Sequence, residues 1–263
     1  MKIMASIPTS SPSVLNLRII PYHKFDPAFN MAADELLFSQ GKPALRFYGW
    51  SPSSVSFGKF NKKFNDIDMD FCRKEGIGLV IRKTGGKTVF HDAELTYSIV
   101  LPSSIFPRGV LETYREISAV IASALAKCNV ATEMESNKNT DESSVCFREV
   151  SSYEITASGK KLVGSAQHRN SRTVLQHGSI LLKADWSKMS RIWRGAFSEQ
   201  QLKQRITCLE DEKSTIGSAE ELAVAISSSA TEAWNSILEH RDFTAEEIAQ
   251  IKSLAPKYAA PLS

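Results

Sequence analysis

The sequence predicts an α+β fold in which mixed β-sheets are flanked by helices. The chain has 263 residues, 42% apolar and 23% charged, which is typical of a globular protein with a sizeable core. Extended segments crowd the middle of the chain, and helical patterns flank them. This order lacks the regular strand–helix alternation of a parallel α/β fold. Near the end, Ser or Thr twice precedes Glu by three residues, which marks two helix starts.

Strands are expected where apolar residues alternate with polar ones or run between turn residues. Every second residue of 95–99 is apolar, which predicts a half-buried strand over 94–102. A first strand is expected over 14–21, ended by Pro21. Ser158-Gly159 is expected to form a hairpin turn. The other expected strands span residues 44–48, 55–58, 78–82, 153–157, 162–166 and 174–182.

The clearest expected helix spans residues 110–125, where apolar residues recur at three- and four-residue spacing. A helix is expected to open at Pro27, and another over 67–75 to stop at Gly76. The last two helices are predicted from capping boxes, namely Ser218 with Glu221 for a helix reaching about Leu238, and Thr244 with Glu247 for a short one.

The pattern divides the chain into three parts. Residues 1–17 are rich in Ser and Pro and are expected to be a flexible tail, with a transit peptide as the alternative. Residues 18–240 are expected to form the catalytic domain, and 241–263 a short helical C-terminal segment. No apolar run reaches the roughly 18 residues of a membrane span, so no membrane association is expected.

The charge and the cysteines restrict the possible partners. A net charge of +3 without a clustered basic face argues against nucleic acid and is compatible with an acidic protein partner. The four cysteines have no CxxC spacing, and no His or Cys cluster predicts a metal site. Reduced thiols in the cytoplasm are therefore expected.

Three segments carry candidate chemistry. The glycine pair in 82–92 lets a ligand approach the backbone, with Arg82, Lys83 and Lys87 beside it, although a tight turn with solvated charges explains the pattern equally well. A lysine in 158–167 could hold an oxyanion, although a hairpin with exposed lysines is the more frequent explanation. Cys146 could be a nucleophile if a cation lowers its pKa, but most single cysteines are buried small hydrophobes.

Several sequence blocks, taken in their order along the chain, resemble one superfamily, which comprises the lipoate–protein ligases, octanoyltransferases and biotin ligases. The resemblance covers about residues 18 to 240. It depends on five blocks: Asn30-Met-Ala-Ala-Asp-Glu, Arg46-Phe-Tyr-Gly-Trp-Ser-Pro, Thr84-Gly-Gly with His91-Asp92, Gly159-Lys-Lys-Leu-Val-Gly-Ser-Ala-Gln, and Leu175-Gln-His-Gly-Ser-Ile-Leu-Leu. Ser143-Ser-Val-Cys-Phe followed by Tyr153-Glu most resembles the cysteine-dependent octanoyltransferases of the Gram-positive type.

The resemblance implies a two-sheet α+β fold of the biotin/lipoate ligase type, with an acyl tunnel near the glycine pair. It implies that Cys146 is the acyl-accepting nucleophile and that Lys161 is the essential lysine. The substrate-binding residues that it implies are Arg46, Arg82, Thr84, Gly85, Gly86, His91, Gly164, Ser165, Gln167, His177 and Gly178. Ile81 stands where the family usually has an arginine before Arg82, so one charge is missing.

The implied activity transfers an octanoyl group from octanoyl-acyl carrier protein to a lysine of a lipoyl domain or of glycine cleavage H protein. No cofactor or metal is implied, and a monomer is expected. One alternative is an ATP-dependent lipoate–protein ligase, which would need ATP and Mg²⁺ but no cysteine at position 146. The others are an octanoyl amidotransferase acting between lipoyl-type proteins and a non-catalytic lipoyl-domain-binding protein.

Overall fold

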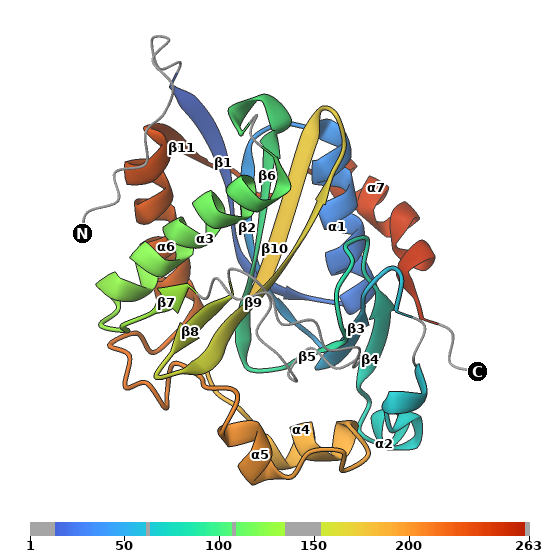
Figure 1. The fold of residues 1–263 in the computed structure, drawn as a ribbon. Coiled ribbons are helices and arrows are strands. Elements are labelled where there is room, and N and C mark those ends of the chain that lie inside the picture. Colours follow the sequence, from blue (N-terminus) through green and yellow to red (C-terminus); the bar gives the residue numbers. More distant parts are fainter. Residues whose placement is uncertain (1–13, 62–63, 107–108, 135–153, 261–263) are drawn as a thin grey trace.

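A computed structural model describes residues 14–61, 64–106, 109–134 and 154–260. Within them the chain forms two sheets (Figure 1). The larger sheet has the strand order β11-β1-β2-β6-β10-β9-β8-β7, and the smaller one has the order β4-β3-β5. The strands are β1 (Leu15–Phe25), β2 (Ala44–Trp50), β3 (Ser54–Phe57), β4 (Gly78–Ile81), β5 (Val89–His91), β6 (Glu94–Pro102), β7 (Glu133–Met134), β8 (Ile155–Ala157), β9 (Lys160–Arg169), β10 (Thr173–Leu181) and β11 (Ser236–His240). This arrangement confirms the predicted α+β class with two mixed sheets.

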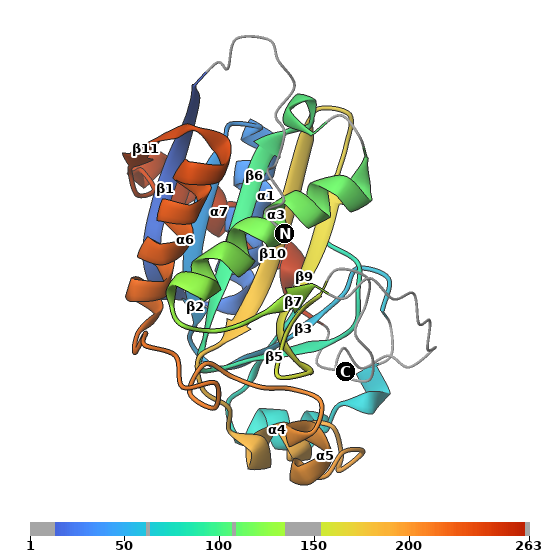
Figure 2. The same ribbon diagram turned by 60° about the vertical axis from the view of Figure 1, so that its left-hand side comes forward.

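Helices cover both faces of the large sheet (Figures 1 and 2). Two of them, α3 and α6, pack on one face, while α1 and α7 lie on the other. A lower layer of α2, α4 and α5 contributes to a separate apolar cluster with the small sheet. The helices are α1 (Pro27–Gln40), α2 (Met69–Lys74), α3 (Val110–Lys127), α4 (Trp186–Ile192), α5 (Glu199–Lys203), α6 (Ala219–Trp234) and α7 (Ala245–Leu254), with 3-10 turns at Phe64–Asp66, Ser103–Ile105 and Ala255–Tyr258.

The alternation in β6 is confirmed, but its half-buried character is wrong. Leu95 and Tyr97 point into the cluster beneath α3 and α6, as their spacing predicts. The opposite face, with Thr96 and Ser98, is also buried. Its polar residues face a covered polar network rather than water, so the alternation separates an apolar layer from a polar one.

The first strand begins close to its predicted start but continues past its predicted end. β1 begins at Leu15, within the strand predicted over 14–21 and therefore inside the expected tail, and it continues through Pro21 to Phe25 with a pairing irregularity between Ile20 and His23. β11 pairs with β1 only as far as Ile19. Pro21 lies beyond this pairing, so its lack of an N–H breaks no hydrogen bond to β11. The predicted hairpin is confirmed, because Ser158 and Gly159 both have positive φ, as a type I′ turn requires.

The last predicted long helix ends early. α6 stops at Asn235, which adopts the left-handed conformation, and residues 236–240 form β11, parallel to β1. The Ser218 side chain caps α6, but the Glu221 carboxylate accepts from the Gly217 N–H, so half of the predicted capping box forms. The capping box before α7 is complete. Strands β5, β7 and β11 and helices α4 and α5 were not predicted.

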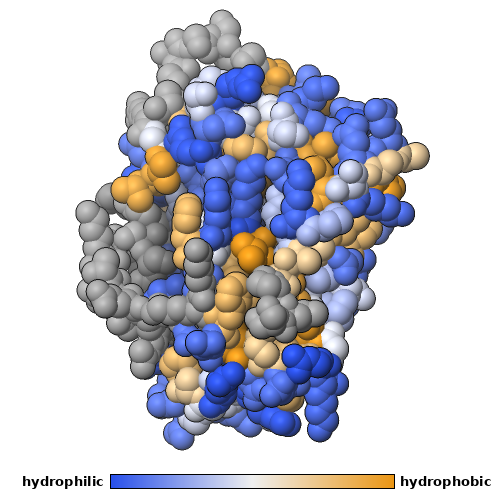
Figure 3. Space-filling view, turned by 90° about the vertical axis from the view of Figure 1, so that its right-hand side faces the viewer, coloured by the Kyte–Doolittle hydropathy of each residue, from blue (hydrophilic) through white to orange (hydrophobic). Residues whose placement is uncertain are grey.

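The C-terminal segment belongs to the same fold. α7 and the turn after it pack against α1, and Ala259 forms an isolated bridge with Val80 of β4. No helix of the described residues is long and apolar enough to cross a membrane. The side of the molecule at the right of Figure 1 is mostly hydrophilic, with apolar side chains gathered in a band through its centre (Figure 3).

Candidate functional site

The glycine-pair loop, residues 82–88 between β4 and β5, is held from inside by Arg82. The residue is 6% exposed. It donates to the hydroxyls of Thr84 and Ser56 at 3.1 Å each, and to the carbonyls of Gly85 and Lys87 at 3.0 and 2.6 Å. In this structure Arg82, predicted to meet a substrate anion, supports the loop that carries the glycines.

The loop can be built only with glycine at certain positions. Gly86 has φ of +96°, a conformation that other residues rarely adopt. Gly58 lies so close beneath the loop that a Cβ there would stand 2.0 Å from the Gly86 carbonyl oxygen. A Cβ on Gly85 would meet only Phe60, at 3.9 Å. Gly85 therefore presents open backbone to a ligand, as the glycine pair predicts.

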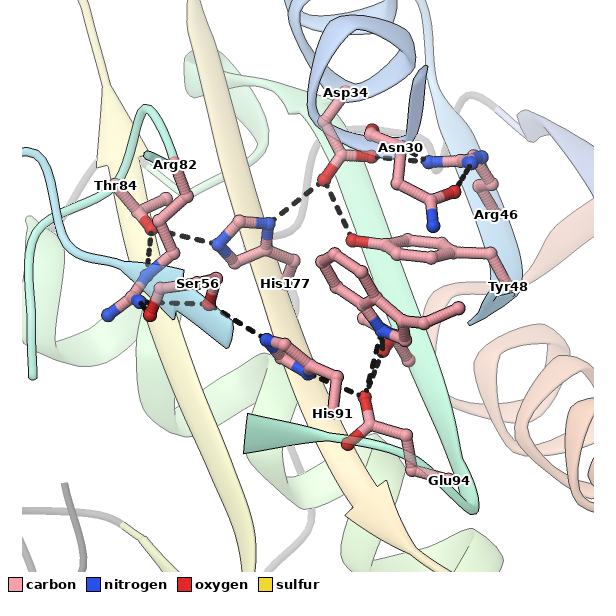
Figure 4. A network of polar contacts seen from close by, with 12 residues as sticks. Asn30, Asp34, Arg46, Tyr48, Ser56, Arg82, Thr84, His91, Glu94 and His177 are labelled. Carbon is pink, nitrogen blue, oxygen red and sulfur yellow. Dashed lines mark hydrogen bonds and ion pairs between the residues drawn. The ribbon is translucent and has the colours of Figure 1, made fainter. Parts of the chain in front are cut away.

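His177 links this loop to the opposite layer (Figure 4). Its Nε2 lies 2.8 Å from the Thr84 hydroxyl, and its Nδ1 lies 2.9 Å from Asp34 Oδ2. Asp34 also binds Arg46 at 3.0 Å and the Tyr48 hydroxyl at 3.2 Å. Burial alone would raise the pKa of Asp34, but the hydrogen bond from His177 and the charge of Arg46 hold it below its ordinary value. The carboxylate is therefore ionised.

His91 forms a second contact of the same kind. Its Nε2 lies 2.8 Å from the Ser56 hydroxyl, and its Nδ1 lies 2.8 Å from Glu94 Oε1. The ring stacks on Trp50, with centroids 4.0 Å apart and planes 13° apart. Figure 4 shows both histidines lying between a carboxylate and a hydroxyl that faces Arg82. The predicted residues Arg82, Thr84, His91 and His177 thus belong to one connected network.

Arg46, which was predicted to bind substrate, is buried in the protein interior. Its side chain is completely buried and is bound by Asp34 and by the carbonyl and side-chain oxygens of Asn30. The guanidinium also lies 4.0 Å above the Tyr48 ring. In this arrangement it contacts other protein groups, and its effect on the site passes through Asp34 and His177.

Lys161 stands at a pocket with mainly apolar walls. Its ammonium donates to Glu154 Oε1 at 2.6 Å, and the two residues are 4% and 3% exposed. The end of the side chain lies over Gly164, where a Cβ would stand 3.0 Å from Lys161 Cε. The absence of a side chain at position 164 therefore lets the end of Lys161 pack against the strand. The pocket is lined by Val89, Phe90, Lys161, Leu162, Gly164, Ser179, Leu181 and Ile206.

The remaining predicted residues lie on β9 and β10. A Cβ on Gly178 would stand 2.5 Å from the Ser165 hydroxyl oxygen and 2.6 Å from the Tyr97 ring, so glycine allows these two side chains to bind at 2.6 Å. Gln167 donates to Gln176 at 3.1 Å on the neighbouring strand. Both pairs place polar groups along β9, the strand that carries Lys161, and along its neighbour β10.

Cys146 lies outside the described residues. The other three cysteines are buried, and burial raises the pKa of each thiol, to about 11 for Cys72 and Cys208. These three thiols are therefore poor nucleophiles at neutral pH. No group of three or more His, Cys, Asp or Glu residues within the described ranges could hold a metal ion.

Sequence reasoning did not single out several residues of the network. Asn30 and Asp34 belong to a block that carried the resemblance, and Glu154 follows Tyr153 in another. Their presence in those blocks was the sequence signal that could have identified them as site residues. Ser56 and Glu94 had none. The pairing of β3 with β5 brings Ser56 to His91, and Glu94 reaches the same ring from three residues along the chain.

Comparisons with known proteins agree with this architecture. The family model described as "Lipoyl protein ligase A/B catalytic domain" matches residues 26–230. Octanoyltransferase LipM of Macrococcus caseolyticus is 39% identical over 225 residues, or 76% of this chain and 81% of the relative. Octanoyltransferase LipM of Staphylococcus aureus is 35% identical over 257 residues, or 89% and 92%.

Among solved structures, a crystal structure of lipoate-protein ligase A bound with ATP superposes with a TM-score of 0.78. It is 22% identical and covers 92% of this chain and 95% of that one. A lipoate protein ligase from Thermoplasma acidophilum gives a TM-score of 0.77 at 20% identity, covering 93% of each chain. At these identities the likeness establishes the fold.

Proposed function

The chain belongs to the lipoyl protein ligase A/B catalytic domain family, and we propose that it is an octanoyltransferase of lipoate biosynthesis. The octanoyl group passes from octanoyl-acyl carrier protein to a lysine of a lipoyl domain or of glycine cleavage H protein. The observation that carries the proposal is the identity of 35% to 39% with the two octanoyltransferases over most of both chains. Lys161, buried at an apolar pocket, supports it.

The reaction proceeds in two acyl transfers. The Cys146 thiolate attacks the thioester carbonyl and a new carbon–sulfur bond forms. The carbon–sulfur bond to the carrier then breaks, and the carrier sulfur takes the electron pair and picks up a proton from solvent. The acceptor amine then attacks the acyl-cysteine. A carbon–nitrogen bond forms, the carbon–sulfur bond breaks, and the Cys146 sulfur and the solvent take the electron pair and the amine proton. Each step exchanges an activated acyl bond, so ATP is not consumed.

Lys161 stabilises the oxyanion of both tetrahedral intermediates. Its ammonium is fixed by Glu154 at 2.6 Å, which gives it one position at the pocket. A preorganised donor of this kind contributes about 3 kcal/mol of transition-state stabilisation. The pocket walls, which include Phe90, Leu162 and Leu181, suit the alkyl chain.

Cys146 is the nucleophile in this proposal. Of the four cysteines, the three that the structure describes are buried, with raised thiol pKa values, and none of them lines the pocket beside Lys161. A reducing cytoplasm would keep the nucleophile as a thiol. We propose that the enzyme acts there as a monomer, without a metal or other cofactor.

Intact mass measurement tests the proposal. The full chain is incubated without ATP with octanoyl-acyl carrier protein, and we expect a gain of one octanoyl group that Cys146→Ala abolishes and Cys128→Ala retains. Addition of an apo lipoyl domain should discharge the adduct. ATP-dependent lipoylation that survives Cys146→Ala would instead identify a ligase. Charging by octanoyl-H protein alone would identify an amidotransferase, and no activity in any arm would leave a binding protein.

A further inference from the structure

Two buried relays of similar composition meet at Arg82. In one, Asp34, His177 and Thr84 follow one another at 2.9 and 2.8 Å. In the other, Glu94, His91 and Ser56 follow at 2.8 and 2.8 Å. Each relay ends in a hydroxyl that accepts a hydrogen bond from the Arg82 guanidinium (Figure 4).

The donors and acceptors fix the direction of both relays. A guanidinium in a protein only donates, so the hydroxyl oxygens of Thr84 and Ser56 must accept from Arg82. Each hydroxyl then retains one O–H. The imidazole Nε2 beside it is the only acceptor that either hydroxyl oxygen contacts among the described residues. Nε2 must therefore accept, which leaves the ring proton on Nδ1, where it is donated to the carboxylate.

A charged imidazole would not fit this arrangement. If His177 or His91 carried protons on both nitrogens, its Nε2 could no longer accept, and the adjacent hydroxyl would lose its hydrogen-bond acceptor. A second cation would also stand beside the buried Arg82. Unpaired buried hydroxyls and neighbouring like charges both destabilise the folded state. The same hydrogen-bond argument holds for both relays, although their residues come from different elements.

We propose that His177 and His91 are positioning residues, held neutral with the proton on Nδ1, and that they orient Arg82, which in turn fixes the glycine-pair loop. Arg82 makes this connection directly, because it donates to the carbonyls of Gly85 and Lys87. Neither histidine takes a proton from the nucleophile or the acceptor amine. Both residues are 6% exposed, and their ring nitrogens are occupied within the network.

Nitrogen-15 NMR of the resting, full-length protein tests the tautomers. The chain has five histidines, and His177→Gln and His91→Gln variants identify the two resonance sets. At neutral pH we expect Nε2 of both rings to resonate as an unprotonated nitrogen and Nδ1 as a protonated one. An imidazolium pattern or a proton on Nε2 in either ring would overturn the proposal. This readout needs no substrate, so it stands even if the proposed octanoyl transfer is not found.

Kinetics test the positioning role, which rests on the proposed octanoyl transfer. Thr84→Val removes the hydroxyl at nearly constant volume, whereas Thr84→Ser keeps it. We expect Thr84→Val to lower kcat/KM for the acyl donor by about 10- to 100-fold, because a shifted loop loses contacts with the bound donor. Most of the loss should appear in KM, because the loop binds ground state and transition state alike. Thr84→Ser should restore most of it.

His177→Ala combined with Thr84→Val should cost little more than either change alone, because both break one relay. His23→Gln, at an exposed histidine outside the network, serves as the control with unchanged kinetics. A kcat loss of about 10² to 10⁴ in His177→Gln, with KM unchanged, would indicate a general base and overturn the proposal.

Discussion

Lys161 Nζ donates to Glu154 Oε1 at 2.6 Å, and both side chains are almost completely buried. The pair joins β9 to the residue just before β8. A buried lysine needs a counter-charge, since burial of an unpaired ammonium is strongly unfavourable. Glu154 therefore determines where the ammonium stands at the pocket.

Removal of either partner should have different consequences for activity and stability. Lys161→Ala should lower kcat by about 10²- to 10³-fold, the usual effect of losing one oxyanion donor. Glu154→Ala should reduce the free energy of unfolding by about 3–5 kcal/mol, because it removes the carboxylate that pairs with a buried ammonium. Urea denaturation and single-turnover acylation measure the two effects. In a Glu154→Ala/Lys161→Ala double variant, stability should partly recover; an additive loss would contradict the pairing.

Thiol alkylation should modify one cysteine in the folded protein. Cys72, Cys128 and Cys208 are buried, and burial raises the pKa of each thiol, so iodoacetamide at neutral pH should react with Cys146. Peptide mass spectrometry should locate one label per chain, and four after denaturation. Prior exposure to the octanoyl donor should block the label. Labelling of Cys128 at a comparable rate in the native protein would contradict the prediction.

Substitution by alanine should affect stability at Gly58, which lies beneath the glycine-pair loop, but not at Gly85, which lies within it. Gly58→Ala places a Cβ 2.0 Å from the Gly86 carbonyl oxygen, so the loop must move, and we expect a loss of about 1–3 kcal/mol in unfolding free energy. Gly85→Ala meets only Phe60, at 3.9 Å, so stability should change little while KM for the acyl donor rises. Thermal unfolding and steady-state kinetics separate the two. Equal stability losses would mean that Gly85 is also packed.

Acid should weaken the attachment of the C-terminal segment. Arg18 binds both oxygens of Glu247 at 2.7 and 2.8 Å, and this hydrogen bond holds the pKa of Glu247 at about 2 despite partial burial. A carboxyl with a lowered folded pKa contributes stability above its unfolded pKa, and that stability is lost as pH falls through the folded value. Between about pH 4.5 and pH 2, wild type should lose more stability than Glu247→Gln. Parallel curves from denaturant titrations would contradict this.

Much of the fold was predictable because the relevant signals are local. The strand at β6, the helix at α3 and the turn at Ser158-Gly159 follow from periodicity and from residues that accept positive φ. β11 was not predictable in this way. The residues after Asn235 continue the helical composition, and they become a strand because they pair with β1, more than 200 residues earlier in the chain. Such pairing depends on tertiary contacts that no local pattern contains.

The sequence alone determined the family, because the blocks that resemble it are contiguous, and from that resemblance it predicted the chemistry of Cys146 and Lys161. Only the tertiary structure decided how the supporting residues are used. It placed Arg46 and Arg82 inside the protein, where their guanidinium groups bind hydroxyls, carbonyls and Asp34. Most donors of a buried guanidinium find hydrogen-bond acceptors. Whether those acceptors belong to a ligand or to protein groups depends on packing between distant segments, here α1, β3, β6 and β10, which meet at the two histidines.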